Sequence, residues 1–140
     1  MVAQLVLVRS MRRALFLITI FALSNMGIFN LFGTSDKPDL DEAVINHLRK
    51  AGSDLAKPHA IEFFLYFPTQ AAAEKAASRV REAGFQAEVQ PPLEGSEWLC
   101  FATKTMVPDL SALQGIRRDF EHLTWLFKGR YDGWGTSVEK

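Results

Sequence analysis

The sequence predicts an α+β fold in which helices pack on one four-stranded antiparallel sheet. The first observation is the run Ile61–Phe67 (IEFFLYF), which is nearly all apolar and is stopped by Pro68. Such a run is too short for a lone helix and indicates a strand buried on both faces in the middle of a sheet. The second is Trp98–Thr103 (WLCFAT), which indicates another interior strand. The third is the order in which helical stretches alternate with these strands.

A helix is expected ahead of the first strand. Asp39 with Glu42 gives a capping-box-like start, and Gly52 suits the left-handed residue that ends a helix. One helical face between them collects Leu40, Val44, Leu48 and Ala51, with His47 beside it. Ser53–Pro58 then forms a polar linker, and Pro58 keeps the next residues extended.

An alanine-rich helix is expected over Gln70–Ala83, where the alanines favour helix and Gly84 ends it. Phe85–Gln90 then alternates between apolar and polar residues, which is typical of a half-buried edge strand. Pro91, Pro92 and Gly95 make the following connection a hairpin loop longer than two residues.

The last helix begins with Pro108 at its first position and Asp109 in its first turn. Its apolar residues recur at helical spacing and end before Gly129: Leu110, Leu113, Ile116, Phe120, Leu123 and Phe127. Arg130–Val138 is short, aromatic and interrupted by glycine, which predicts an edge strand with a bulge.

Two right-handed βαβ crossovers joined by one hairpin give a ferredoxin-like βαββαβ sandwich with an extra N-terminal helix. Both continuous apolar strands then take the central positions of the four-stranded antiparallel sheet. One face of that sheet carries no crossover helix, and Glu62, Phe64 and Tyr66 point to it. We expect the extra helix, Asp39–Ala51, to cover part of this face, because so many exposed aromatic side chains are unfavourable.

Residues 1–35 form a separate apolar leader, and residues 36–140 form a single domain. Ala14–Ser35 contains no charged residue and follows three arginines, Arg9, Arg12 and Arg13. One interpretation is a signal peptide cleaved near Ala22-Leu23-Ser24, which would export the domain. A second is a membrane anchor within residues 9–33, with the domain outside the cytoplasm. A third is that translation starts at Met26.

Charge is distributed unevenly along the chain, although Lys and Arg total 16 and Asp and Glu also total 16. The leader holds three arginines and no acid, so residues 36–140 hold 13 bases against 16 acids, a net charge of −3. A mildly acidic domain argues against a nucleic-acid binder, whose affinity depends on neutralising phosphates. Cys100 is the one cysteine, which excludes an intramolecular disulfide and a cysteine metal cluster.

No constellation of catalytic residues emerges from the sequence. His47, His59 and His122 follow no metal-ligand spacing, and each is interpreted as a surface or boundary histidine. Cys100 lies within an expected central strand, where a thiol is inert packing. Neither a G-x-S-x-G motif nor a phosphate-binding loop is present. We therefore expect no catalytic residue, no metal and no cofactor.

Aromatic residues on two central strands are also typical of RNA-recognition modules, which stack bases on them. Phe64, Tyr66 and Phe101 have suitable positions. The basic-Gly-aromatic pattern of those modules is missing from the third strand, and the domain is acidic. These rings are therefore expected in the core or beneath the extra helix.

The closing segment Tyr131-Asp132-Gly133-Trp134-Gly135-Thr136 places two large aromatic residues around an Asp-Gly turn. In a structural interpretation it is a bulged edge strand in which Trp134 covers the core and Asp132 caps the turn. In a functional interpretation it is a partner-binding rim, because Trp and Tyr dominate interface hot spots. Residue chemistry alone favours the structural interpretation.

Read with the rest of the chain, this segment resembles the regulator of ribonuclease E activity B family. The matching stretches are Asp41-Glu42-Ala43, His59–Pro68 (HAIEFFLYFP), Glu82-Ala83-Gly84-Phe85, Trp98, Thr103–Asp109 (TKTMVPD) and Tyr131–Val138 (YDGWGTSV). The resemblance covers about Asp39–Val138. It implies a small, non-catalytic, ferredoxin-like protein in the bacterial cytoplasm that binds ribonuclease E, inhibits it and so alters RNA turnover.

The first functional hypothesis is accordingly a non-enzymatic, protein-binding regulator whose partner is a ribonuclease E-type enzyme. Tyr131, Asp132, Gly133, Trp134 and Gly135 would carry the contact, and solvated carboxylates would steer a basic partner segment. No direct contact with nucleic acid is expected. The alternative is a small ligand-binding or enzymatic domain that uses a pocket between the sheet and the extra helix.

Overall fold

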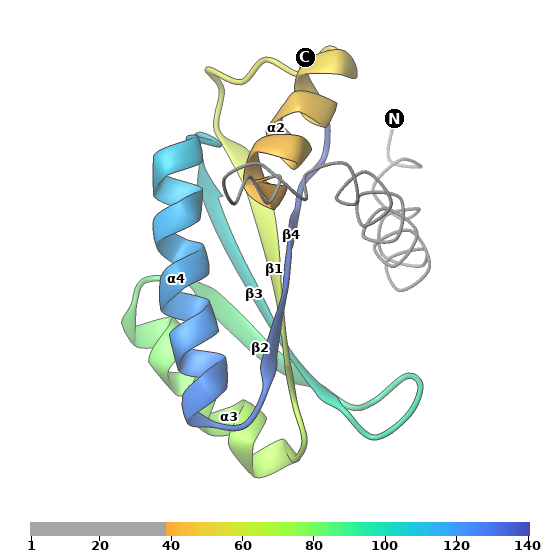
Figure 1. Ribbon diagram of the computed structural model, residues 1–140, viewed down its shortest axis with the longest axis vertical. Helices are drawn as coiled ribbons and strands as arrows, with labels where there is room; N and C mark the ends of the chain where they lie inside the picture. Colours follow the sequence, from red (N-terminus) through yellow and green to blue (C-terminus); the bar gives the residue numbers. More distant parts are fainter. Residues whose placement is uncertain (1–38) are drawn as a thin grey trace, which may run out of the picture.

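The structure, a computed structural model, describes residues 39–140. All three interpretations of the leader fall on residues outside this range. The described chain contains seven elements in the predicted order: α2 (Leu40–Lys50), β1 (His59–Phe67), α3 (Gln70–Glu82), β2 (Gln86–Gln90), β3 (Trp98–Met106), α4 (Leu110–Leu126) and β4 (Arg130–Gly135). Figure 1 shows α3 and α4 on one side of the sheet and α2 near the upper ends of β1 and β4.

The sheet has the strand order β2-β3-β1-β4, and every neighbouring pair is antiparallel. This order confirms the ferredoxin-like α+β sandwich, with the two continuous apolar strands at its centre. Phe63 lies between Ala102 of β3 and Trp134 of β4, and Phe64 lies opposite Phe101. The prediction that β1 is buried on both faces is confirmed, because Phe63 and Phe64 point to opposite faces and are 0% and 3% exposed.

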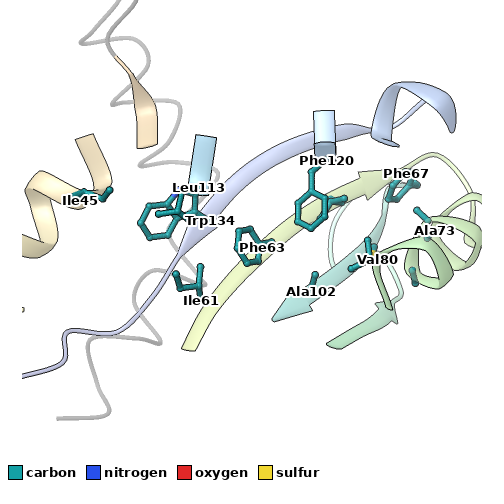
Figure 2. Close-up of a cluster of buried hydrophobic side chains, with 14 of the residues drawn as sticks. Ile45, Ile61, Phe63, Phe67, Ala73, Val80, Ala102, Leu113, Phe120 and Trp134 are labelled. Atoms are coloured by element: carbon teal, nitrogen blue, oxygen red, sulfur yellow. The ribbon is translucent and has the colours of Figure 1, made fainter. Parts of the chain in front are cut away.

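The core lies between the sheet and its helices. Alternate residues of β1 enter it, and all four are fully buried: Ile61, Phe63, Leu65 and Phe67. Each apolar side chain of this size contributes about 1.5–3 kcal/mol when it leaves water. The alanine-rich face of α3 lies against them (Figure 2). Phe120 of α4 meets the Phe63 ring edge-on, with 5.4 Å between the ring centroids.

The predicted position of the extra helix is wrong. α2 packs on the same side of the sheet as α3 and α4 and contacts α4. Its Ile45 and Leu48 join the core cluster that contains Leu113 and Trp134 (Figure 2). The inward face of α2 is therefore rotated from the predicted one, because Asp41 is buried while Ala51 is exposed.

This correction also removes the basis of the alternative functional hypothesis. A pocket between the open face of the sheet and the extra helix requires α2 on that face. α2 lies on the opposite side, and no helix within residues 39–140 covers the open face (Figure 1).

Several element ends differ from the predictions by a few residues. β3 continues to Met106, three residues past the predicted end, because it pairs with β1 along its whole length. β4 stops at Gly135 rather than Val138, and its register against β1 shifts between Phe63 and Leu65. The bulged edge strand is thus confirmed. Asp109 is the N-cap of α4 instead of a first-turn residue, and its carboxylate accepts a hydrogen bond from the N–H of Ala112.

Gly129 follows α4 for a reason that the sequence did not reveal. The left-handed residue after the helix is Lys128, with φ of 58°, and Gly129 itself needs no positive φ. A Cβ at Gly129 would lie 2.3 Å from the carbonyl oxygen of Tyr66 and 2.6 Å from the Phe67 ring. The turn into β4 therefore passes so close to β1 that only glycine fits.

Gly129→Ala is expected to destabilise the protein by about 1–3 kcal/mol, since backbone must move to admit the methyl group. Gly115→Ala is the matched control. The nearest atom to a Cβ there is the Arg118 guanidinium at 3.8 Å, so alanine in mid-helix should stabilise by about 0.5–1 kcal/mol. Urea unfolding of both variants measures the difference, and equal effects of the two changes would contradict the close-packing argument.

Candidate functional site

The predicted contact segment, Tyr131–Gly135, lies on the edge strand β4. The bulge against β1 turns its side chains to two different sides of the sheet. Tyr131 and Trp134 pair with Leu65 and Phe63 and point to the helical side, where both lie in or against the core. Asp132 lies on the open side with Arg130. The structure therefore does not gather these residues into one patch.

Trp134 is part of the core. Its side chain is 6% exposed, and its Nε1–H donates a hydrogen bond of 2.9 Å to Oδ1 of Asp41 on α2. Figure 2 shows its ring beside Leu113, with Ile45 of α2 facing it. The structural interpretation of this residue is thus supported by its burial. The partner-binding role of the segment stays a prediction.

Asp41 is the centre of a buried polar cluster that sequence reasoning missed. The carboxylate has no exposed surface, and Arg117 of α4 binds it with two hydrogen bonds. Arg117 Nε donates to Oδ2 at 2.8 Å and Nη2 donates to Oδ1 at 2.7 Å. The hydrogen bond and negative charge of Asp41 raise the pKa of Arg117 above its ordinary value. Together with the hydrogen bond from Trp134, this ion pair links α2, α4 and β4.

The acidic residues at the start of α2 are visible in the sequence, but their partners on α4 are not. Asp39 is the N-cap of α2, as predicted, since its carboxylate accepts hydrogen bonds from the N–H groups of Asp41 and Glu42. Gln114 of α4 donates a further hydrogen bond to Asp39. Asp41 and Arg117 are 76 positions apart. No local pattern connects them.

On the open side of the sheet, Arg130 organises the surface of β4. Its guanidinium binds Glu97 at 2.8 and 3.0 Å and Asp132 at 3.0 Å, and it lies 4.5 Å from the centre of the Tyr66 ring. The carboxylates and the positive charge hold one another in place, and Glu97 raises the pKa of Arg130. This cluster is partly exposed and lies on the open side of the predicted contact segment.

The aromatic residues of the open face are not an exposed stacking platform. Phe64 and Phe101 pack edge-on with 5.3 Å between ring centroids and are 3% and 8% exposed. Tyr66 lies under Arg130. The RNA-recognition interpretation therefore gains no support from these three rings.

The interpretation of His59 as a surface or boundary histidine is wrong, because its side chain is fully buried. Its Nδ1 is 2.7 Å from the carbonyl oxygen of Lys57, and its Nε2 is 2.7 Å from Oγ of Ser53. A carbonyl can only accept, so Nδ1 carries a proton. Ser53 Oγ in turn accepts from the N–H of Glu139 at 3.0 Å. His59 thus fastens the C-terminal tail to the start of β1, with both nitrogens engaged.

The remaining residues considered as catalytic or metal-binding groups, His47, His122 and Cys100, do not lie together in one site. His47 and His122 are exposed on separate helices, and residues 39–140 hold no cluster of three or more potential metal ligands. Burial raises the pKa of the Cys100 thiol to about 12. Among the same residues, no helix combines the length and the apolar character needed to cross a membrane.

The family model described as Regulator of ribonuclease activity B matches residues 39–136, which is more than half of the chain. The match begins at the cap of α2 and ends one residue after β4, so it includes the extra helix with the sandwich. No curated protein matches the chain.

Arg117→Met is expected to destabilise the protein by about 3–5 kcal/mol, because it leaves the Asp41 carboxylate buried without its cation. Arg118→Met, the exposed neighbour on the same helix, should change stability by about 0.5 kcal/mol or less. Chemical denaturation of the two variants provides the comparison. A small effect of Arg117→Met would mean that Trp134 alone can hold the carboxylate.

Cys100 is expected to resist alkylation by iodoacetamide at about pH 8, because a buried thiol with a raised pKa has almost no thiolate. Mass spectrometry of native and urea-unfolded protein tests this, with modification expected only after unfolding. Rapid labelling of the native protein would place Cys100 in an accessible, reactive environment.

Proposed function

The chain belongs to the Regulator of ribonuclease activity B family, and from this premise we propose that it binds a ribonuclease E-type endoribonuclease in the bacterial cytoplasm and inhibits it. Regulation would proceed by protein–protein contact, with no reaction catalysed by the regulator itself and no direct contact with RNA. The effect in the cell is a change in RNA turnover. The family match over residues 39–136 is the observation that carries this proposal.

The charge of the domain supports a protein partner with a basic segment. Residues 39–140 contain 12 Lys and Arg against 15 Asp and Glu, a net charge of −3. Such a domain repels RNA but attracts the basic segments of RNA-processing enzymes, which raises the association rate at low salt. Binding should therefore weaken as salt concentration increases.

We place the contact on the open side of β4. There Asp132 is held by Arg130, and Arg130 is held by Glu97. Tyr131, Gly133, Trp134 and Gly135 would act by fixing the bulged path of the strand, since the two aromatic residues anchor it from the helical side. A rigid strand presenting a fixed carboxylate loses little entropy when a partner docks.

The test measures cleavage of a fluorogenic RNA by the purified ribonuclease E-type enzyme of the same genome, with and without the full-length protein. Wild-type protein should slow cleavage in a concentration-dependent and salt-sensitive manner. Unchanged cleavage, together with absence of binding in calorimetry, would overturn the proposed function.

Asp132→Asn tests the location of the contact, and it should weaken inhibition by roughly tenfold, the size of effect expected for a polar hot spot. Asp119→Asn, an exposed carboxylate on α4, is the matched control and should inhibit like wild type. Full inhibition by Asp132→Asn would move the contact away from β4 while leaving the function in place.

A further inference from the structure

The centre of the open face is buried, although no helix within residues 39–140 lies on that face. Phe64 of β1 and Phe101 of β3 lie opposite each other there and are 3% and 8% exposed. Neighbouring side chains shield the sides of such a ring, but its top reaches solvent unless another layer covers it. The β2–β3 loop supplies no such layer, since its apolar residue Leu93 is 96% exposed.

Exposure increases from the centre of the open face towards its margins. Glu62 and Tyr66, on either side of Phe64 along β1, are half-buried. Ala60 near the start of β1 and Glu88 on β2 are exposed. The burial is therefore concentrated over the middle of β1 and β3, which indicates the place where a further segment packs.

Carboxylates are the main charged groups of the open face. Glu62 of β1 and Glu88 of β2 share this face with Phe101 and its neighbours by strand register, and Asp132 of β4 lies there with Arg130. Within the described part of the chain, neither Glu62 nor Glu88 makes an ion pair.

Cations are fewer on this face. The four strands contain two Lys or Arg residues, Lys104 and Arg130. Lys104 is on the helical side, with its Nζ 4.8 Å from the centre of the Phe85 ring. Arg130 is on the open face and is already shared between Glu97 and Asp132. The face is therefore net negative, and an occupant must bring positive charge together with apolar side chains.

The N-terminal segment of this chain, residues 9–33, has both properties. It begins with Arg9, Arg12 and Arg13 and contains no acidic residue. After Arg13 it is uncharged and predominantly apolar. Its aromatic residues are Phe16, Phe21, Phe29 and Phe32.

The described chain also begins at a suitable edge of the sheet. Trp134 of the edge strand β4 donates a 2.9 Å hydrogen bond to Asp41, so Asp39, two residues earlier, starts beside β4. Residues 34–38 read Thr-Ser-Asp-Lys-Pro and can span up to about 17 Å when extended. Packed layers lie only about 10 Å apart. The chain ahead of α2 can therefore pass the β4 edge and reach the open face.

We infer that residues 9–33 dock on the open face of their own domain, with apolar side chains over Phe64 and Phe101 and the arginines against the carboxylates of that face. A short linker keeps the effective concentration of the segment high, which favours this intramolecular contact. Arg130 is exposed at the margin of the face. The inference goes beyond the proposed function and does not depend on the ribonuclease.

Other arrangements fit the open face less well. A second copy of this chain in a two-fold dimer would bring two identical acidic faces together. Export by cleavage of the leader, or its insertion into a membrane, would leave the aromatic centre of the face without its cover, which is unfavourable in water. A start of translation at Met26 would remove the three arginines.

Photo-cross-linking of the full-length protein tests the docking. The photoreactive residue p-benzoylphenylalanine replaces Tyr66 on the open face in one variant and Trp125, a 73% exposed aromatic residue of α4, in the matched control. Mass spectrometry should find cross-links from position 66 to peptides of residues 9–33, and few from position 125. Equal cross-linking at both positions, or none to residues 9–33 from position 66, would overturn the inference.

Two additions to this experiment make its result decisive. Thr103, opposite Glu62 on the same face, is the second site for the photoreactive residue if the variant at position 66 does not fold. Each variant is also irradiated in a mixture with isotope-labelled protein. Cross-links that join labelled to unlabelled chains would place a second copy on the face and reject the intramolecular contact.

Charge reversal on the open face tests the role of the arginines. Glu62→Lys combined with Glu88→Lys should lower the yield of the cross-link from position 66 several-fold, because the new cations repel the segment. Glu74→Lys, at an exposed position on α3, is the matched control and should leave the yield unchanged. An unchanged yield in the double variant would contradict the charge complementarity and, with it, the assignment of this segment to the face.

The intact mass of the protein isolated from its own cells completes the test. The inference requires residues 9–33 to be present and the protein to remain in the supernatant when membranes are sedimented. A mass that lacks this segment, or recovery of the protein in the membrane pellet, would rule the docking out.

Discussion

The carboxylate of Asp41 has no exposed surface, and the arrangement of the helical side of the molecule depends on how its charge is compensated. An uncompensated buried charge is too costly for a protein of ordinary stability. Arg117 and Trp134 supply three hydrogen bonds to its two oxygens, from α4 and from β4. This fixes α2 on the helical side, where Ile45 and Leu48 then complete the core. The extra helix is thereby part of the domain rather than an appendage.

The two sides of the sheet therefore differ in what they contain. The helical side holds most of the core, and both aromatic residues of the closing segment lie in or against it. The open side holds Arg130, Asp132 and Glu97, whose mutual ion pairs form a fixed, partly exposed surface.

Neither edge of the sheet is arranged for the addition of a partner strand. At β2, Arg81 Nε–H donates a 3.0 Å hydrogen bond to the carbonyl of Ala87, which occupies an acceptor on that edge. At β4, the bulge and Gly133, with φ of 100°, interrupt a regular ladder. Bulges and blocking side chains protect edge strands from unspecific pairing. These features oppose extension of the sheet by a strand of another chain.

By itself, the sequence determined the order of the elements, the two central strands, the α+β class and the bulge in the last strand. These follow from local signals: continuous apolar runs, helical spacing, and glycine or proline at the ends. Only the tertiary structure decided where α2 packs, that His59 is buried, that Trp134 binds Asp41, and that Gly129 is required by contact with β1. Each of these features depends on groups that are far apart in the chain, such as Asp41 and Arg117. The residue pattern within one segment cannot predict which distant charged group will contact that segment.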